Sequence, residues 1–230
     1  MSDDFIPSVW LGNEKGFYVW RISRDMKRWD LCFAALGTDT LKVLVKEQMN
    51  TYVETRPTKL INKGKEFIHW SERSGWAHLY LYDENGNLKN PITSGEFHVE
   101  SVSAVDEAAR VVYFTANAKE PGENPYYTHQ YRVNFDGTGL KVINAGNFNH
   151  EAITSDNGKF FVDNYSRVDT APCSALYNNN GQLITLLEKT DLSLLFDAGY
   201  KFPEIFSIKA GDGVTDLYGV MYKPFDFDST

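Results

Sequence analysis

The chain has 230 residues, of which 42% are hydrophobic and 14% aromatic, and this composition excludes a disordered or low-complexity protein. The formal net charge is −8, so the chain lacks the excess of basic residues that is typical of nucleic-acid-binding proteins. No run approaches the roughly 20 apolar residues of a membrane-spanning helix. Two cysteines, Cys32 and Cys173, are too few for a disulfide framework or a Cys-rich zinc site, so both are expected to be buried thiols.

Short β-type segments recur along the chain, beginning with GFYVWRI (16–22). Each is rich in Phe, Tyr, Val, Ile and Leu, which fit a pleated and half-buried surface. Asx-Gly pairs such as Asn85-Gly86 and Asn180-Gly181 readily adopt the positive φ angles that tight hairpin turns require. The segments expected to form strands are 16–22, 30–36, 41–47, 66–72, 77–83, 89–95, 110–116, 129–135, 140–146, 159–165, 173–179 and 182–188.

The strand pattern repeats with a period of about 45 to 50 residues, which is typical of β-propeller blades. The apolar anchors of the successive repeats are Phe17, Phe67, Val112 and Phe160. One further strand for each later repeat is expected at 52–60, 97–105 and 149–155. The sequence therefore predicts an all-β fold, a β-propeller fragment of about four four-stranded antiparallel blades that occupies residues 1–202.

The C-terminal part departs from this pattern. DLSLLFDAG (191–199) predicts one short helix with Asp191 as N-cap and Gly199 as its stop. Residues 203–230 then predict a hairpin around Asp212-Gly213 that does not continue the repeat. We expect this hairpin to open a different domain.

The run WSERSGWAHLYLYD (70–83) places Ser71 and Ser74 near two histidines, His69 and His78, which invites comparison with a catalytic triad. A nucleophilic serine needs a base within hydrogen-bond reach, and the two histidines lie on opposite sides of the expected turn. No G-x-S-x-G elbow surrounds either serine. The run is therefore interpreted as a β-hairpin.

Two further groups of polar residues are candidates for binding. Glu96, His98 and Glu100 alternate along one expected strand face and could hold a metal with His150 or Glu151, although alternation is also what any half-exposed strand shows. We expect no metal site and no cofactor. Tyr52, Glu54 and Arg56 lie between two expected blades, where they could face the central channel and bind a charged peptide end or could form ordinary surface charge.

Several runs resemble the N-terminal propeller of dipeptidyl peptidase IV-type prolyl peptidases. The most specific is W-S-E-R-x-G-W-x-H-L-Y within 70–83, and LYGVMYKPFDFD (217–228) is similar to the segment that enters the α/β-hydrolase domain of that family. The other runs that carry the resemblance are FIPSVW (5–10), RISRDMKRWDL (21–31), ITSGEFHVESV (92–102), YRVNFDG (131–137) and NHEAITSDNGKFFVDNYS (149–166).

The resemblance implies that this chain is the C-terminal half of an eight-bladed propeller. Members of the family are serine exopeptidases that release N-terminal dipeptides, usually with Pro or Ala second. Their Ser, Asp and His belong to a hydrolase domain expected after Thr230, and their paired glutamates to a blade expected before Met1. The resemblance therefore assigns no catalytic residue here. It places the stretch near Tyr52 beside the extended substrate pocket, so Tyr52, Glu54 and Arg56 are the candidates for substrate binding.

Two functions follow as expectations. In the first, the chain is a non-catalytic part of a periplasmic, secreted or cell-surface dipeptidyl peptidase, in which the propeller gates and shapes the substrate chamber beside the hydrolase domain. In the second, it is a stand-alone propeller module that binds a peptide or protein partner. Half of an eight-bladed ring would leave the faces of its end blades open, so a homodimer is a further expectation.

Overall fold

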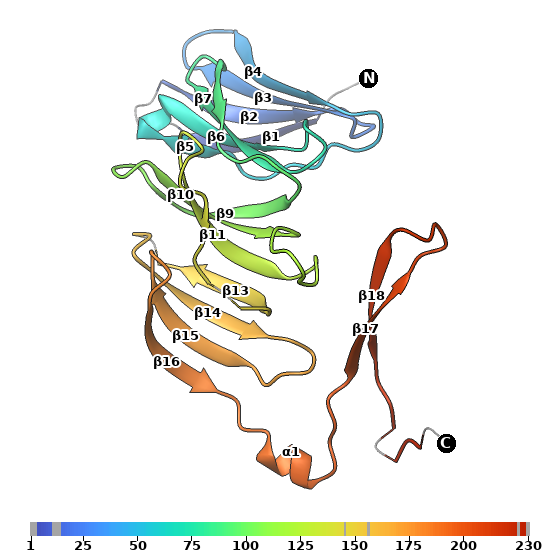
Figure 1. Ribbon diagram of the computed structural model, residues 1–230. Helices are drawn as coiled ribbons and strands as arrows, with labels where there is room; N and C mark the ends of the chain where they lie inside the picture. The colour runs from blue at the N-terminus through green and yellow to red at the C-terminus, as the bar shows by residue number, and fades with distance from the viewer. Residues whose placement is uncertain (1–3, 11–14, 145, 156, 225, 229–230) are drawn as a thin grey trace. The chain divides into compact units, whose positions relative to one another are not determined.

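The computed structural model describes residues 4–10, 15–144, 146–155, 157–224 and 226–228, and of 4–10 the backbone only. The described part is almost entirely antiparallel β-structure, with four four-stranded sheets followed by a two-stranded hairpin. Figure 1 colours the strands along the chain, from blue at β1–β4 to orange at β13–β16. These sheets are the blades of a β-propeller fragment, as the period of the sequence predicts.

The first two sheets are formed by consecutive strands. The first has the order β1-β2-β3-β4 and the second β5-β6-β7-β8, with a short 3-10 turn, η1, between β5 and β6. The strands of the first sheet are β1 (Asp4–Trp10), β2 (Gly16–Ile22), β3 (Arg28–Ala35) and β4 (Leu41–Gln48). Those of the second are β5 (Lys59–Ile61), β6 (Glu66–Ser71), β7 (His78–Asp83) and β8 (Leu88–Pro91), and η1 spans Asn62–Gly64.

The third and fourth sheets repeat the arrangement, with orders β12-β11-β10-β9 and β13-β14-β15-β16. A helix of one turn, α1, and the hairpin β17-β18 follow in the chain. The strands of these sheets are β9 (His98–Asp106), β10 (Val111–Asn117), β11 (Thr128–Asn134), β12 (Lys141–Val142), β13 (Asn149–Thr154), β14 (Phe160–Ser166), β15 (Cys173–Asn178) and β16 (Leu183–Lys189). The last elements are α1 (Ser193–Asp197), β17 (Glu204–Lys209) and β18 (Asp216–Met221).

The chain divides into two compact units, which are described separately. Unit 1 comprises residues 1–101, 105–112 and 133–140, and unit 2 comprises 102–104, 113–132 and 141–230. The core of unit 1 packs side chains of the first two sheets together, and Tyr18 meets Phe67 edge to face at 6.4 Å. The buried members of this core are Tyr18, Trp29, Leu31, Leu44, Val45, Val53, Phe67, Tyr80 and Tyr82.

The turn between β7 and β8 lies against the backbone of β4, within unit 1. Gly86 has a φ of 85°, and a Cβ at this position would lie 2.8 Å from the Cα of Leu44, so only glycine fits. The Asp83 carboxylate accepts the backbone N–H groups of Asn85 and Asn87 at 2.9 and 2.8 Å and fixes the turn. Two more turn glycines lie against backbone. A Cβ at Gly181 would lie 2.7 Å from the Ile143 carbonyl in unit 2, and one at Gly137 would lie 3.3 Å from the Pro91 and Ile92 carbonyls in unit 1.

Several expected strands are shorter in the structure. Of 52–60 only Lys59 and Leu60 are strand, at the start of β5, because Pro57 lacks the N–H group that a paired strand would donate. Of the described residues within 140–146, Lys141–Val142 form strand β12, and of 89–95 only the first part pairs, in β8, which ends at Pro91.

The C-terminal elements and one cysteine differ in detail from the prediction. The predicted helix is present, but Leu192 occupies its N-cap position and the Asp191 side chain accepts the Ser193 N–H at 2.9 Å without capping the helix proper. Gly199 follows α1 with a φ of 89°, and the hairpin turns at Gly213 as expected. Cys32 is a buried thiol, whereas Cys173 is only half-buried because it lies at the start of β15.

Candidate functional site

The connection between β4 and β5 carries the residues predicted to bind substrate. The Val53 N–H donates to the Met26 carbonyl at 2.9 Å, and the Val53 side chain is buried in the core of unit 1. Successive side chains of an extended chain point to opposite sides, so burial of Val53 turns Tyr52 and Glu54 outward. Tyr52 is 53% exposed. Pro57 favours an extended conformation at the residue before it, which keeps Arg56 in the same outward-facing segment.

The Arg56 guanidinium is held by contacts on three sides. Its Nε donates to the Glu100 carbonyl at 3.0 Å, and its Nη1 donates to the Thr55 carbonyl at 3.1 Å and to the Glu54 carboxylate. The guanidinium carbon lies 4.9 Å from the centre of the Trp70 ring, a cation–π geometry. The Trp70 indole is fixed in turn, because its Nε1 donates to the Val99 carbonyl at 2.6 Å. Arg56 is therefore oriented by its surroundings before any ligand binds.

Two acidic side chains lie beside the Arg56 guanidinium. Glu54 pairs with Nη1, and a carboxylate oxygen of Glu100 lies 3.9 Å from Nη2, so two carboxylates face one guanidinium. Within the described residues, the two hydrogens on Nη2 make no hydrogen bond. Glu54 and Glu100 are 40% and 38% exposed. The cluster can thus donate from Nη2 to a carbonyl or carboxylate and accept an ammonium group at its two acids.

An indentation beside Arg56 adds apolar surface to this cluster. It has a volume of about 160 Å³ and is lined by Trp20, Ile22, Trp29, Thr55, Arg56 and Pro57. Trp20 and Trp29 lie 6.0 Å apart between ring centres and form one wall. A small apolar side chain fits this volume, with the guanidinium at its edge.

The structure brings together two of the three predicted residues. Glu54 and Arg56 form an ion pair, but in the described part of the chain Tyr52 makes no hydrogen bond or ring contact with either. The partners that sequence reasoning missed are Trp70 and Glu100. The alternation at 96, 98 and 100 did signal Glu100, yet it suggested a metal, whereas Glu100 contacts Arg56 and lies 3.6 Å from His98. Among the described residues, no group of three or more potential ligands is arranged to hold a metal.

The run 70–83 forms the hairpin of β6 and β7, with Ser71 opposite His78. Ser71 Oγ accepts the Nε–H of Arg73 at 3.0 Å, so the serine interacts with arginine. His78 shares a hydrogen bond with the Thr93 hydroxyl at 3.1 Å and donates from Nε2 to the Gly95 carbonyl at 2.9 Å. Burial lowers the pKa of His78, and the Gly95 hydrogen bond opposes this shift. No hydrogen bond joins a serine to a histidine in this hairpin as far as the structure describes it, and the hairpin interpretation is confirmed.

The same hairpin builds a charged network with β4. Arg73 donates to the Glu47 carboxylate and to the Tyr82 hydroxyl, and His69 donates from Nε2 to Glu47 at 3.1 Å. Burial alone would raise the pKa of Glu47, but the hydrogen bond from His69 and the charge of Arg73 outweigh it and lower that pKa. His69 is fully buried, and burial lowers its pKa despite the Glu47 contact. The network is a structural link between the first two sheets.

Comparison with known proteins shows which protein family this chain resembles. The family model for the dipeptidyl peptidase IV (DPP IV) N-terminal region matches residues 2–172. Dipeptidyl peptidase 8 of Mus musculus is 31% identical over 195 residues, which cover 70% of this chain and 21% of that protein; the Homo sapiens protein is 32% identical with the same coverage. The chain thus spans about a fifth of the length of these curated relatives.

Two solved structures share the fold. A Bacteroides ovatus protein assigned as a dipeptidyl aminopeptidase IV superimposes with a TM-score of 0.80 at 25% identity, covering 98% of this chain and 34% of that one. Porphyromonas gingivalis dipeptidyl peptidase 4 gives a TM-score of 0.77 at 23% identity, covering 93% of this chain and 30% of that one. The chain therefore corresponds to about a third of each solved protein.

Proposed function

This chain belongs to the dipeptidyl peptidase IV N-terminal region family, and we propose that it is the non-catalytic propeller portion of a serine-type dipeptidyl peptidase. The observation that carries the proposal is the family match over residues 2–172, supported by the four antiparallel blades and by relatives that are themselves dipeptidyl peptidases. In this proposal the whole protein releases N-terminal dipeptides with Pro or Ala second. The propeller gates and shapes the chamber in which the peptide is cleaved.

The substrate-binding part of the proposal rests on the Arg56 cluster. A peptide bound beside it would accept hydrogen bonds from Arg56 Nη2 through a backbone carbonyl, because Trp70 and Glu100 hold the guanidinium in place. Glu54 and Glu100 would attract a positively charged amino end. Tyr52, exposed on the same connection, would cover the peptide from outside. These residues would position the substrate, and the chemistry would be performed elsewhere in the parent enzyme.

The C-terminal hairpin is proposed to lead into an α/β-hydrolase domain, with the domain boundary near residue 203. Its support is the apolar surface of the elements that precede and form the hairpin. Every residue of β16 is exposed, including Leu183, Leu186 and Leu187, and Ile208 of β17 is 56% exposed. Exposed apolar strands of this extent favour coverage by another part of a protein. The described residues contain no helix long and apolar enough to span a membrane. We propose a periplasmic, secreted or cell-surface parent by analogy with the family.

The proposal is tested on the parent enzyme. Its reading frame is expected to continue past Thr230 into a G-x-S-x-G elbow, whereas a stop codon there would favour a stand-alone module that binds peptides. Arg56→Gln should lower kcat/KM for an Ala-Pro p-nitroanilide about tenfold, mainly through KM, since an oriented charged hydrogen bond is lost. Arg24→Gln, an equal charge change at an exposed arginine outside the cluster, is the control. Equal kinetics for both variants would remove Arg56 from the substrate site.

A further inference from the structure

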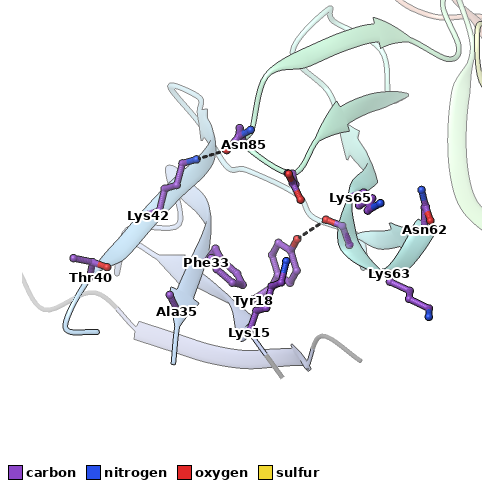
Figure 2. Close-up of a pocket in the computed structure, with 12 residues that line it drawn as sticks. Lys15, Tyr18, Phe33, Ala35, Thr40, Lys42, Asn62, Lys63, Lys65 and Asn85 are labelled. Atoms are coloured by element: carbon purple, nitrogen blue, oxygen red, sulfur yellow. Dashed lines mark hydrogen bonds between the residues drawn. The ribbon is translucent and has the colours of Figure 1, made fainter. Parts of the chain in front are cut away.

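A second and larger cavity of unit 1 plays no part in the proposed function. It has a volume of about 620 Å³ and lies between the ends of β2, β3 and β4 in the first sheet and residues 62–65 and 84–85 of the second. Figure 2 shows Tyr18 and Phe33 side by side within it, with Lys42 and Asn85 on one side and residues 62–65 on the other. Small-molecule sites in proteins have volumes of roughly 300–1,000 Å³, so the cavity can accommodate a ligand.

The cavity is basic although the chain as a whole is acidic. Among the residues that the structure describes, four lysines line it, Lys15, Lys42, Lys63 and Lys65, against one carboxylate, Glu84, whereas the net charge of the chain is −8. Lys42 Nζ donates to Asn85 Oδ1 at 3.0 Å, which holds one ammonium group in place without neutralising it. As far as the structure describes the chain, Lys63 and Lys65 form no side-chain hydrogen bond or ion pair. A concave surface with one sign of charge concentrates ions of the other sign.

The segment that carries Lys63 and Lys65 has an uncommon backbone. Asn62, Lys63 and Gly64 have φ values of 48°, 55° and 82°, so two consecutive non-glycine residues adopt the left-handed region. Such conformations are costly and are concentrated at binding sites, where the surrounding structure holds them. Here the Glu107 carboxylate accepts the Asn62 N–H at 2.8 Å, and the Lys65 N–H donates back to the Asn62 carbonyl at 3.3 Å. The two lysines are therefore presented from a fixed turn.

The inner wall of the cavity is apolar. The rings of Tyr18 and Phe33 lie 5.4 Å apart, and Ala35 continues this wall at the end of β3. Burial, together with the Glu84 charge, raises the pKa of Tyr18, so its phenol stays neutral. The Tyr18 hydroxyl donates to the Gly64 carbonyl at 3.5 Å. This contact connects the first sheet to the turn across the cavity. Lysines at the rim and aromatic rings at the wall match a molecule with an anionic group and an apolar body.

We propose that this cavity binds a small organic anion, a carboxylate or phosphate ester that carries an aromatic or aliphatic body. The anionic group contacts Lys42 and Lys65, and the body packs on Phe33 and Ala35. The site is separate from the Arg56 cluster, so it neither requires nor supports the assignment of this chain to a peptidase.

Titration calorimetry of the 230-residue chain with naphthalene derivatives tests the proposal. The probes are 1-naphthyl phosphate, 1-naphthoate, the neutral 1-naphthylmethanol and inorganic phosphate. We expect saturable binding of the two aromatic anions and much weaker binding of the alcohol and of phosphate, since each lacks one half of the recognised chemistry. The ratio between naphthyl phosphate and naphthoate shows which of the two anion types the cavity prefers. Raising the salt concentration should weaken the binding.

Matched variants locate the site. Lys42→Gln and Lys65→Gln should each weaken binding about two- to fivefold, as expected for an exposed charge, and Lys59→Gln, the same change at an exposed residue of β5, should have no effect. Glu84→Gln should strengthen binding, a gain that a merely structural role cannot produce. Ala35→Trp should abolish binding by filling the cavity, with thermal melting as a check on folding. Equal affinities of the alcohol and the anions, no saturable binding, or equal effects of the lysine variants and the Lys59 control would overturn the proposal.

Discussion

Glu66 on β6 provides the sharpest test of the energetics of unit 1. Its carboxylate accepts Arg110 Nη1 at 2.8 Å and Nη2 at 3.2 Å, and Lys89 Nζ lies 2.5 Å away. The Glu66 side chain is 12% exposed, and Arg110 also lies over the Phe135 ring at 4.4 Å. The hydrogen bonds from Arg110, with a smaller contribution from Lys89, lower the pKa of Glu66 from its ordinary 4.5 to about 2. The carboxylate therefore stabilises the fold when it is ionised.

The magnitude follows from this pKa. A change from 4.5 to about 2 corresponds to about 3 kcal/mol at 1.36 kcal/mol per unit. The cationic partners, Arg110 and Lys89, are 46% and 45% exposed, so solvent screening reduces the contribution to about 1–2 kcal/mol. Glu66→Gln keeps the shape and removes the charge. We expect Glu66→Gln to lower the free energy of unfolding at pH 7 by about 1–2 kcal/mol, measured by urea denaturation.

The contribution of Glu66 to stability depends on pH. Since the folded-state pKa of Glu66 is depressed, its contribution is complete above about pH 4.5 and disappears as the pH falls towards 2. The difference between wild type and Glu66→Gln should shrink over the same interval. Glu72→Gln, which removes the carboxylate of the residue directly after β6, controls for the change in net charge. A pH-independent difference, or a loss at pH 7 no larger than that of the control, would refute the reasoning.

Four further predictions follow from named contacts. Gly86→Ala should cost about 2–4 kcal/mol in unfolding free energy, because its Cβ meets the Leu44 backbone, whereas Gly75→Ala, also at positive φ but in open space, should cost only about 1 kcal/mol. Because burial lowers the pKa of His69 below its unfolded value of 6.5, stability should fall as the pH decreases through 6.5, and His69→Gln should flatten that slope in urea titrations. The isolated chain should not hydrolyse Pro-containing dipeptide amides, so any turnover lost on Ser71→Ala would mean that the hairpin has been misinterpreted. Light scattering should detect a homodimer that Leu186→Glu weakens, since β16 is exposed, and a monomer at every concentration would contradict this.

The repeated architecture was predictable because its signals are local. Period-two aromatic runs and Asx-Gly turns determine strand and hairpin independently in each repeat, which is why β2, β6, β10 and β14 lie close to their expected positions. The lengths of the short outer strands were overestimated, because the length of an outer strand depends on how many of its residues pair with the neighbouring strand. β12 is an example, because the sequence after it continues as a strand would, yet of β12 and β11 only Lys141 and Val142 pair, with Arg132 and Tyr131.

The candidate site was only partly predictable for the same reason. Glu54 and Arg56 are two residues apart, so their pairing could be inferred from the sequence. Trp70 and Glu100 reach Arg56 from other strands, and no spacing in the sequence encodes that approach. The basic cavity was missed entirely, because its four lysines come from three separate segments and the average charge of the chain is negative.

The turn glycines that lie against a preceding sheet also affect how the protein is made. Gly86 docks on the backbone of β4, Gly137 on the end of β8 at Pro91 and Ile92, and Gly181 on Ile143, which follows β12. In each case the receiving backbone is synthesised before the turn that docks on it. A blade that leaves the ribosome therefore finds its docking surface already present, which favours assembly from the N-terminal end during translation. A glycine-to-alanine change at one of these turns would interrupt that order at a defined blade.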